Sequence, residues 1–258
     1  STRAQRSVGR VRRPAGPRAP VVAARVRLGH SSRMSLLEAV TAALTAVADP
    51  SRAPAMQRYM KSTMPFLGVP QPLLRRVLKP VWAAHPLATA AAWRREVRAL
   101  WRAATVREHR YAAIELTELR AHRGYQDLDA LPLYAELITT GAWWDLVDPL
   151  AGHRLRFLLE QHGAPIRAAM LAWSRGEDLW LRRAAILCQL GRKSQMDLEL
   201  LYAVIEPALP SREFFLRKAI GWALRDLARA EPDEVRRYVA AHESRLSGLS
   251  KREALKHL

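Results

Sequence analysis

Cysteine is nearly absent from this sequence: Cys188 is the single one among 258 residues. No disulfide can therefore form within the chain, which excludes the small disulfide-stapled folds. No stretch approaches the ~20 uninterrupted apolar residues of a transmembrane helix. We expect a soluble, cytoplasmic protein without a membrane partner. Cys188 itself lies in the apolar run 184–190, which predicts a core position.

The spacings that hold metals and phosphates are also missing. The eight histidines and Cys188 show no metal-ligand spacing, and neither a glycine-rich phosphate loop nor a nucleophile elbow is present. We predict no metal and no cofactor. A lyase reaction through a lysine Schiff base stays open, with Lys218 as its candidate, although contact with phosphate or solvent is the simpler interpretation of that residue.

Acidic residues are few relative to basic ones. The chain has 24 Asp+Glu against 42 Lys+Arg, a formal net charge of +18. This excess exceeds what solubility requires and indicates a polyanionic partner such as nucleic acid, with an acidic membrane surface as the alternative. The hydrophobic content of 49% is enough for a substantial core.

Residues 1–33 differ from the rest of the chain. They contain nine arginines and no acid, with scattered Pro, Gly and Ser and no helical period. This composition predicts a disordered arm. Three interpretations remain open: a DNA-contacting tail, an Arg-rich transit-type leader, or translated upstream sequence, since Met34 begins the ordered pattern. The remaining residues 34–258, which we expect to form one domain, still carry +9.

Strand patterns are missing too, because Val and Ile rarely alternate with polar residues, whereas the helix formers Ala, Leu and Arg dominate. The sequence predicts an all-α fold. Apolar spacing, caps and prolines predict these elements: a helix after the N-cap Ser35 that ends at Asp49-Pro50, residues 51–60, a proline-rich connector at 61–72, helices at 73–82 and 87–103, and a helix over 107–123 capped by Thr105.

Short basic motifs recur along the chain. Arg110-Tyr-Ala-Ala-Ile114, Arg182-Arg-Ala-Ala-Ile186 and Arg217-Lys-Ala-Ile220 align, and their spacing corresponds to a period of 35 to 40 residues. In an all-helical chain such a period indicates stacked helix pairs, because one pair cannot bury its apolar face alone. We therefore expect a helical-repeat solenoid whose concave groove is lined by Arg110, Arg182, Arg217 and Lys218. A basic groove of this kind suits the phosphate backbone of a duplex.

The stretch Gly141-Ala-Trp-Trp-Asp-Leu-Val-Asp148 combines indoles with acids. Read as a helix, it places Trp144 and Asp148 side by side, where a cation could be held between a ring and a negative charge. Arg183 follows Trp144 by 39 residues and Trp222 follows Arg183 by 39, so the three could converge on one ligand.

Two structural alternatives compete with this interpretation. Indoles at repeat positions often fill the core between helices, and Trp143, Trp173 and Trp180 are the better candidates for that role. Arg183 could likewise be an ordinary ion-pair residue between repeats.

Five separated segments, in the right order, resemble the AlkD family of bacterial DNA glycosylases. The resemblance runs from about Tyr59 to the C-terminus, and its segments are Tyr59-Met-Lys-Ser-Thr-Met-Pro-Phe-Leu-Gly68, Trp143-Trp-Asp-Leu-Val-Asp148, Leu179-Trp-Leu-Arg-Arg-Ala-Ala-Ile-Leu187, Glu213-Phe-Phe-Leu-Arg-Lys-Ala-Ile-Gly-Trp222 and Ser250-Lys-Arg-Glu-Ala-Leu-Lys256. The chain departs from the family in its basic arm and in the connector 64–76, which leaves open which adducts it accepts.

The resemblance implies a HEAT-like repeat fold and particular site residues. Trp144 and Trp222 would flank the lesion, Asp148 would be the essential aspartate, and Arg183 would bind phosphate. The implied activity is that of a monofunctional glycosylase, which removes N3- or N7-alkylated purines from duplex DNA without flipping the base.

Further expectations follow from this resemblance. They are a duplex-DNA partner with an alkylated purine, a monomeric protein associated with the nucleoid, and bulky adducts as substrates, as in self-resistance to a DNA-alkylating natural product. The alternative is a non-catalytic scaffold of the same fold that binds DNA or a protein.

Overall fold

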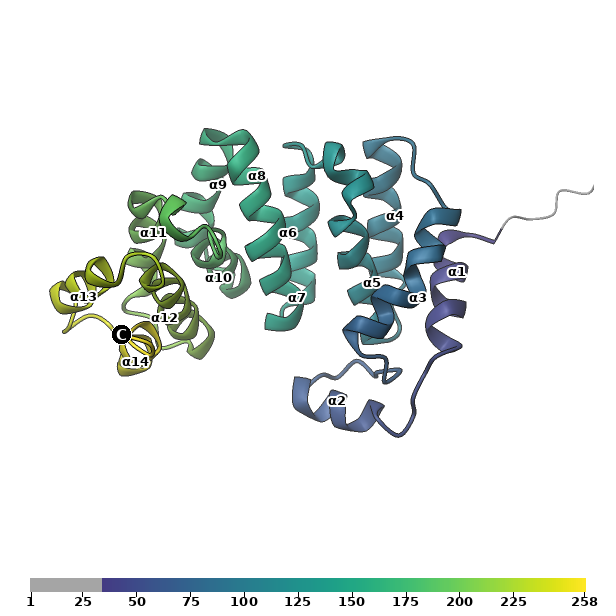
Figure 1. The fold of residues 1–258 in the computed structure, drawn as a ribbon, viewed down its shortest axis with the longest axis horizontal. Helices are drawn as coiled ribbons and strands as arrows, with labels where there is room; N and C mark the ends of the chain where they lie inside the picture. The colour runs from purple at the N-terminus through teal and green to yellow at the C-terminus, as the bar shows by residue number, and fades with distance from the viewer. Residues whose placement is uncertain (1–33) are drawn as a thin grey trace, which may run out of the picture. The chain divides into compact units, whose positions relative to one another are not determined.

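The computed structural model describes residues 34–258, so the predicted arm at 1–33 lies outside the described residues. The described part is built from α-helices and contains no strand. In Figure 1 the helices follow one another from α1 to α14. Their bounds are α1 Leu36–Thr45, α2 Ala53–Met60, α3 Gln71–Ala84, α4 Ala90–Arg102, α5 Arg107–Glu118, α6 Ala130–Gly141, α7 Trp144–Pro149, α8 Arg156–His162, α9 Ala164–Arg175, α10 Leu179–Leu187, α11 Leu198–Ile205, α12 Phe214–Ala228, α13 Pro232–Ala241 and α14 Gly248–Ala254.

Shorter helical segments join some of these helices. One is a π-helix, η2 (Leu150–Leu155), which continues directly from α7. The others are the 3₁₀ segments η1 Arg120–Tyr125, η3 Lys193–Gln195 and η4 Glu206–Ala208. Among residues 34–258, no helix is both long enough and apolar enough to span a membrane.

Helices that are neighbours in sequence pack together, as α4 does with α5 and α9 with α10. Each pair also contacts the next one, since α4 packs on α6 and α10 on α12. One apolar core therefore runs between successive pairs. Its largest fully buried side chains include Trp93 and Tyr134. This arrangement confirms the prediction of an all-α helical-repeat fold.

Several helix starts follow the expected capping chemistry. Ser35 caps α1, and the Glu38 carboxylate accepts from the Ser35 amide at 2.8 Å, which completes a capping box. The prediction that Thr105 caps the next long helix is wrong. α5 begins at Arg107 without any side-chain cap, because the Arg107 amide donates to the Pro65 carbonyl of the connector at 2.9 Å.

This same helix ends earlier than the predicted Arg123. α5 stops at Glu118, and residues 120–125 form a 3₁₀ segment instead. The cause lies in side chains that take the carbonyls which a longer helix would use. The Thr117 carbonyl accepts from Gln126 Nε2 at 2.9 Å and from Arg154 Nη1 at 3.0 Å.

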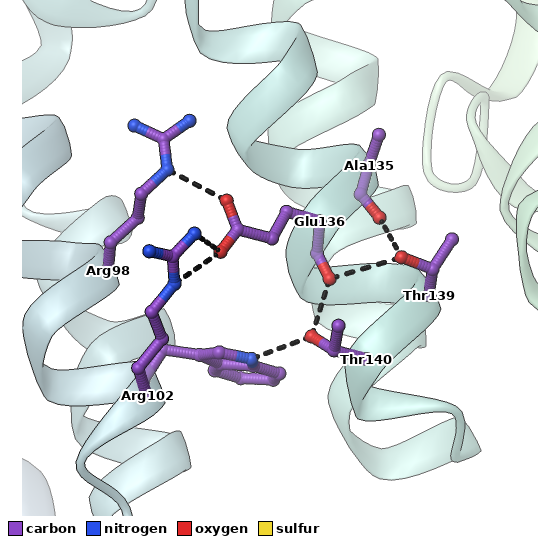
Figure 2. Close-up of polar contacts among 7 residues, drawn as sticks. Arg98, Arg102, Ala135, Glu136, Thr139 and Thr140 are labelled. Atoms are coloured by element: carbon purple, nitrogen blue, oxygen red, sulfur yellow. Dashed lines mark hydrogen bonds and ion pairs between the residues drawn. The ribbon is translucent and has the colours of Figure 1, made fainter.

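Polar contacts between repeats involve many of the basic residues. Figure 2 shows Arg98 and Arg102 of α4 reaching the Glu136 carboxylate of α6. The Nε–Oε2 distance is 2.8 Å for Arg98 and the Nη2–Oε1 distance is 2.6 Å for Arg102. Trp101 adds a hydrogen bond from Nε1 to Thr140 Oγ1 at 2.8 Å. Part of the positive charge therefore ties helices together.

The connector between α2 and α3 is held by one buried carboxylate. Glu108 of α5 accepts from the amides of Leu67, Gly68 and Val69 at 2.9, 2.9 and 3.0 Å. Gly68 has φ +86°, and a Cβ there would lie 2.1 Å from the Asp49 carbonyl oxygen, so only glycine fits. α2 itself has no buried residue. Three of its apolar side chains pack partly buried against the core, so these contacts and the hydrogen-bonded connector together hold α2 in place.

Candidate functional site

The stretch 141–148 is a helix end followed by a new helix. Gly141 ends α6, Ala142 is left-handed with φ 42°, and α7 begins at Trp144. The prediction of one helix over 141–148 is therefore wrong in its first residues, because the left-handed Ala142 ends one helix before the next begins. Trp144 and Asp148 still lie one turn apart on α7, as the pattern required.

Asp148 forms a bidentate salt bridge with Arg183 of α10. Arg183 Nε lies 2.8 Å from Asp148 Oδ1, and Arg183 Nη2 lies 2.9 Å from Oδ2. The third nitrogen, Nη1, donates to the Phe215 carbonyl at 2.6 Å. Only 5% of the Arg183 side chain and 11% of the Asp148 side chain are exposed. The pair fixes the direction of both groups.

Burial raises the pKa of Asp148 above the ordinary value of an aspartate. The hydrogen bonds and charge of Arg183 act in the opposite direction, and the charge of Asp145 adds to the rise. Arg183 is therefore the group that favours the ionised form of this carboxyl.

Two cavities flank Asp148. The first has a volume of about 600 Å³ and the second about 510 Å³. Trp144, Asp148 and Trp222 line both, so these three side chains form the wall that the cavities share. The aspartate thus shares both cavities with one indole from α7 and one from α12. The 39-residue spacing predicted that Trp144, Arg183 and Trp222 converge, and all three line the second cavity.

Cavity 1 has both apolar and charged lining residues. Its apolar lining comes from α2, the connector and α5, namely Met56, Met60, Val69 and Ile114. The charged lining is made of pairs between helices: Arg75 Nε lies 3.0 Å from Glu115 Oε2, and His153 Nδ1 lies 2.7 Å from Glu118 Oε1. Cavity 1 can therefore hold a group that carries both apolar surface and polar atoms.

Cavity 2 contains Arg183 and most of the free aromatic surface near Asp148. Phe214 lies at its edge and is 56% exposed. Tyr59, 74% exposed, lies edge-on to Trp144 with ring centroids 6.5 Å apart. Lys218 also lines this cavity, and its Nζ is 2.7 Å from Glu253 Oε1. Exposed rings beside cations are suited to nucleic acid.

The other three predicted DNA-binding arginines line neither cavity. Arg110 donates to the Thr140 carbonyl at 3.2 Å and lies over the Trp101 ring. Arg182 and Arg217 donate, each at 3.0 Å, to the carbonyls of Pro207 and Ser211. The structure therefore brings Arg183 and Lys218 together with Asp148 and leaves these three apart. Contact of the five with DNA stays a prediction.

The tryptophans that were assigned to the core do pack there. Trp180 is buried, and its ring lies 5.9 Å from that of Trp143 and 4.8 Å from that of Phe215. Trp143 and Trp173 are partly buried against the same core. Cys188 is buried as predicted, and burial raises its pKa to about 12, so the thiol is neutral.

A second ion pair on α7 was not singled out from the sequence. Arg107 Nε lies 3.1 Å from Asp145 Oδ2, and the hydroxyl of Tyr111 donates to the same oxygen at 2.5 Å. A signal did exist, because Arg107 precedes Asp145 by 38 residues, nearly the separation of 35 between Asp148 and Arg183. Acid–arginine pairs at the repeat spacing could therefore have been sought.

The described residues contain no group of three or more His, Cys, Asp and Glu side chains arranged to hold a metal ion.

Comparisons with known proteins give a family and a similar solved structure. The model of the family described as DNA alkylation repair enzyme matches residues 40–258. No curated protein matches the chain. Among solved structures, the chain is similar to a predicted DNA alkylation repair enzyme from Enterococcus faecalis, with 28% identity and a TM-score of 0.72, covering 82% of this chain and 96% of that one.

Proposed function

The chain belongs to the DNA alkylation repair enzyme family, and we propose that it is a monofunctional DNA glycosylase. Its substrates would be cationic N3- or N7-alkylated purines in duplex DNA. One observation carries the proposal: the Asp148 carboxylate lines the same two cavities as the indoles of Trp144 and Trp222.

The reaction needs little acid catalysis. An alkylated purine already carries a positive charge, so the glycosidic C1′–N bond breaks with its electron pair and the base leaves neutral. Positive charge then develops on the deoxyribose. A carboxylate and the faces of two indoles stabilise such a centre. Water adds to C1′ and loses its proton to Asp148 or to solvent, which leaves an abasic sugar.

Arg183 would serve this reaction in two ways. Its pair with Asp148 keeps the carboxyl ionised and aimed at the cavities. Three of its five N–H groups are engaged with Asp148 and Phe215, so two remain for a phosphate oxygen beside the lesion. Loss of Arg183 would therefore weaken DNA binding as well as catalysis.

We propose that the lesion stays stacked in the duplex while the protein grips the backbone, as the family resemblance implies. A bulky substituent would then enter cavity 1, whose volume of about 600 Å³ is far larger than a methyl group needs. Its apolar wall of Met56, Met60 and Ile114 suits an extended apolar adduct. Release of methylated bases with no release of a bulky adduct would remove this part of the proposal.

The first experiment measures release of free base from a duplex that carries 7-methylguanine, at two salt concentrations. We expect wild type to release base and Asp148→Asn to lose about 100-fold or more in single-turnover rate. The variant should still bind the duplex.

If both proteins bind DNA and neither releases base, the test is repeated with a bulky N3-alkyladenine. Failure there would leave the non-catalytic DNA-binding scaffold in place of the glycosylase. A protein-binding scaffold would lack salt-dependent affinity for DNA altogether.

A further inference from the structure

Three side chains of α12 face cavity 2 together. Lys218, Trp222 and Arg225 follow one another at intervals of four and three residues, which places them on one side of the helix. All three line the cavity. Trp222 is thus bracketed by two cations, one turn before it and one turn after it.

Glu253 of α14 forms ion pairs with both cations. Lys218 Nζ lies 2.7 Å from Oε1 of Glu253, and Arg225 Nη1 binds the other oxygen, Oε2. The hydrogen bond from Lys218 lowers the pKa of Glu253, and that from Arg225 adds to the effect, so the carboxylate is ionised. Two cations on two oxygens of one anion is also how a phosphodiester is held.

The close packing of α14 on α12 places Glu253 there. A Cβ at Gly221 would lie 2.4 Å from Glu253 Cβ and 2.9 Å from the Ser250 carbonyl oxygen. Ser250 Oγ in turn donates to the Arg217 carbonyl at 2.9 Å. The backbone of α14 therefore cannot withdraw without breaking this contact. The side chain of Glu253 can rotate away, since 17% of it is exposed at the cavity.

We propose that Lys218 and Arg225 form a binding site for a phosphate of duplex DNA, and that Glu253 occupies this site until DNA displaces it. The inference rests on the proposed function only in taking duplex DNA as the partner. Glu253 acts as a built-in competitor, so part of the attraction between the basic protein and any duplex is cancelled. The consequence is weaker binding to undamaged DNA and easier release of the product.

Binding to an undamaged duplex tests this without any chemistry. We expect Glu253→Gln to bind about tenfold tighter than wild type at low salt, an effect of the size of one charge-assisted hydrogen bond. The dependence of log K on log salt should become steeper by about 1, since one internal ion pair no longer offsets a phosphate contact. Fluorescence anisotropy across a salt series measures both.

The matched control is Glu206→Gln. Glu206 pairs with Arg245, lines neither cavity 1 nor cavity 2, and its loss changes the net charge equally. We expect it to change affinity less than twofold. An equal gain from both variants would mean that only net charge matters and would overturn the proposal.

A double-mutant test locates the effect. In the background Lys218→Met with Arg225→Met, the change Glu253→Gln should give no gain in affinity. A full gain there would show that Glu253 acts elsewhere. No gain from Glu253→Gln in the wild-type background would also overturn the proposal, provided that its melting temperature matches that of wild type.

If Glu253→Gln does not fold, carbon-13 NMR of the Glu253 carboxyl in the wild type replaces it. Addition of duplex should raise the pKa of this group, because its two cations are taken. An unchanged titration with bound DNA would contradict displacement. None of these results depends on base release, so failure of the glycosylase proposal and failure of this one are separate outcomes.

Discussion

Helix α7 carries two acid–arginine pairs that share a chemistry and differ in their surroundings. Asp145 binds Arg107 of α5, and Asp148 binds Arg183 of α10. Asp145 also accepts from Tyr111, so one of its oxygens has two donors. Each oxygen of Asp148 has one donor, and this group lines both cavities, whereas Asp145 lines cavity 1 alone. Both acids are paired, so pairing does not separate a candidate catalytic carboxylate from a structural one. The difference lies in the acceptor sites that remain unused and in access to the cavities.

The two pairs also act on each other. The charge of Asp145 contributes to the raised pKa of Asp148, one turn further along the helix. Burial raises the pKa of Tyr111 too, with Asp145 acting in the same direction, so the phenol stays protonated and donates. Asp145 and its partners therefore anchor α7, and Asp148 is the member left open for chemistry.

The largest expected effect separates the two acids by rate. Asp148→Asn should lower single-turnover base release by about 100-fold or more, because the charge that faces the sugar is lost. Asp148→Asn also leaves the charge of Arg183 without its carboxylate, and only 5% of that side chain is exposed, so we expect the free energy of unfolding to fall by about 3–5 kcal/mol as well. If Asp145→Asn, shown by circular dichroism to be folded at the assay temperature, lost as much rate as Asp148→Asn, the two acids would not differ in their roles.

The next effect separates them by stability. Asp145→Asn leaves the Arg107 charge buried without a counter-charge, with 6% of its side chain exposed. We expect the free energy of unfolding to fall by about 3–5 kcal/mol, and by more than in Asp148→Asn, because the hydrogen bond from the Tyr111 hydroxyl to the ionised carboxylate is weakened as well. Urea denaturation measures this, with Asp148→Asn as the matched control. A cost below that of Asp148→Asn would reverse the assignment of roles.

A third effect concerns pH. The reaction requires ionised Asp148, so activity should fall as pH decreases through its pKa, which lies above that of an ordinary aspartate. Arg183→Met removes the group that lowers this pKa. The acidic limb of the kcat/KM profile should therefore move to higher pH, whatever the height of the profile. Spontaneous depurination measured without protein is subtracted at each pH. A limb that stays in place would show that another group controls it.

The smallest effect refines the anchoring cluster. Tyr111→Phe deletes one hydrogen bond to the buried Asp145 carboxylate, at a cost of about 1.5–3 kcal/mol in unfolding free energy. The acidic limb should stay where it is in wild type, because both charges of the pair remain. Movement of that limb by this variant would mean that the two pairs cannot be treated separately.

The repeat architecture could be predicted from the sequence because periodicity and spacing carry it. Helical spacing and the absence of strand patterns identified the all-α fold, and intervals of 39 residues brought Trp144, Arg183 and Trp222 to one cavity. Helix ends were harder. Neither Thr105 nor Arg123 proved to be a boundary of α5. Groups distant in sequence act at both ends: the Pro65 carbonyl accepts from the first amide of the helix, and two side chains donate to the Thr117 carbonyl near its last residue.

Side-chain direction was the other limit. Arg182 and Arg183 are neighbours on α10, but successive helical residues point about 100° apart. Arg183 therefore reaches Asp148 while Arg182 reaches the Pro207 carbonyl. Alignment of repeats identified equivalent positions without showing which of two adjacent arginines faces the cavity. Asp145 was missed similarly, since its partner Arg107 lies 38 residues away in another helix.

The way that α2 is attached has a consequence for changing what the protein accepts. Glu108 holds the connector through three backbone amides, and the side chains of α2 that pack against the core are only partly buried. Met56 and Met60 nevertheless line cavity 1, and Tyr59 stands beside Trp144. The hydrogen bonds from Glu108 to the backbone of the connector do not depend on the side chains of α2. Substitutions of Met56 and Met60 that keep an apolar side chain can therefore reshape the cavity wall while the connector keeps its three hydrogen bonds.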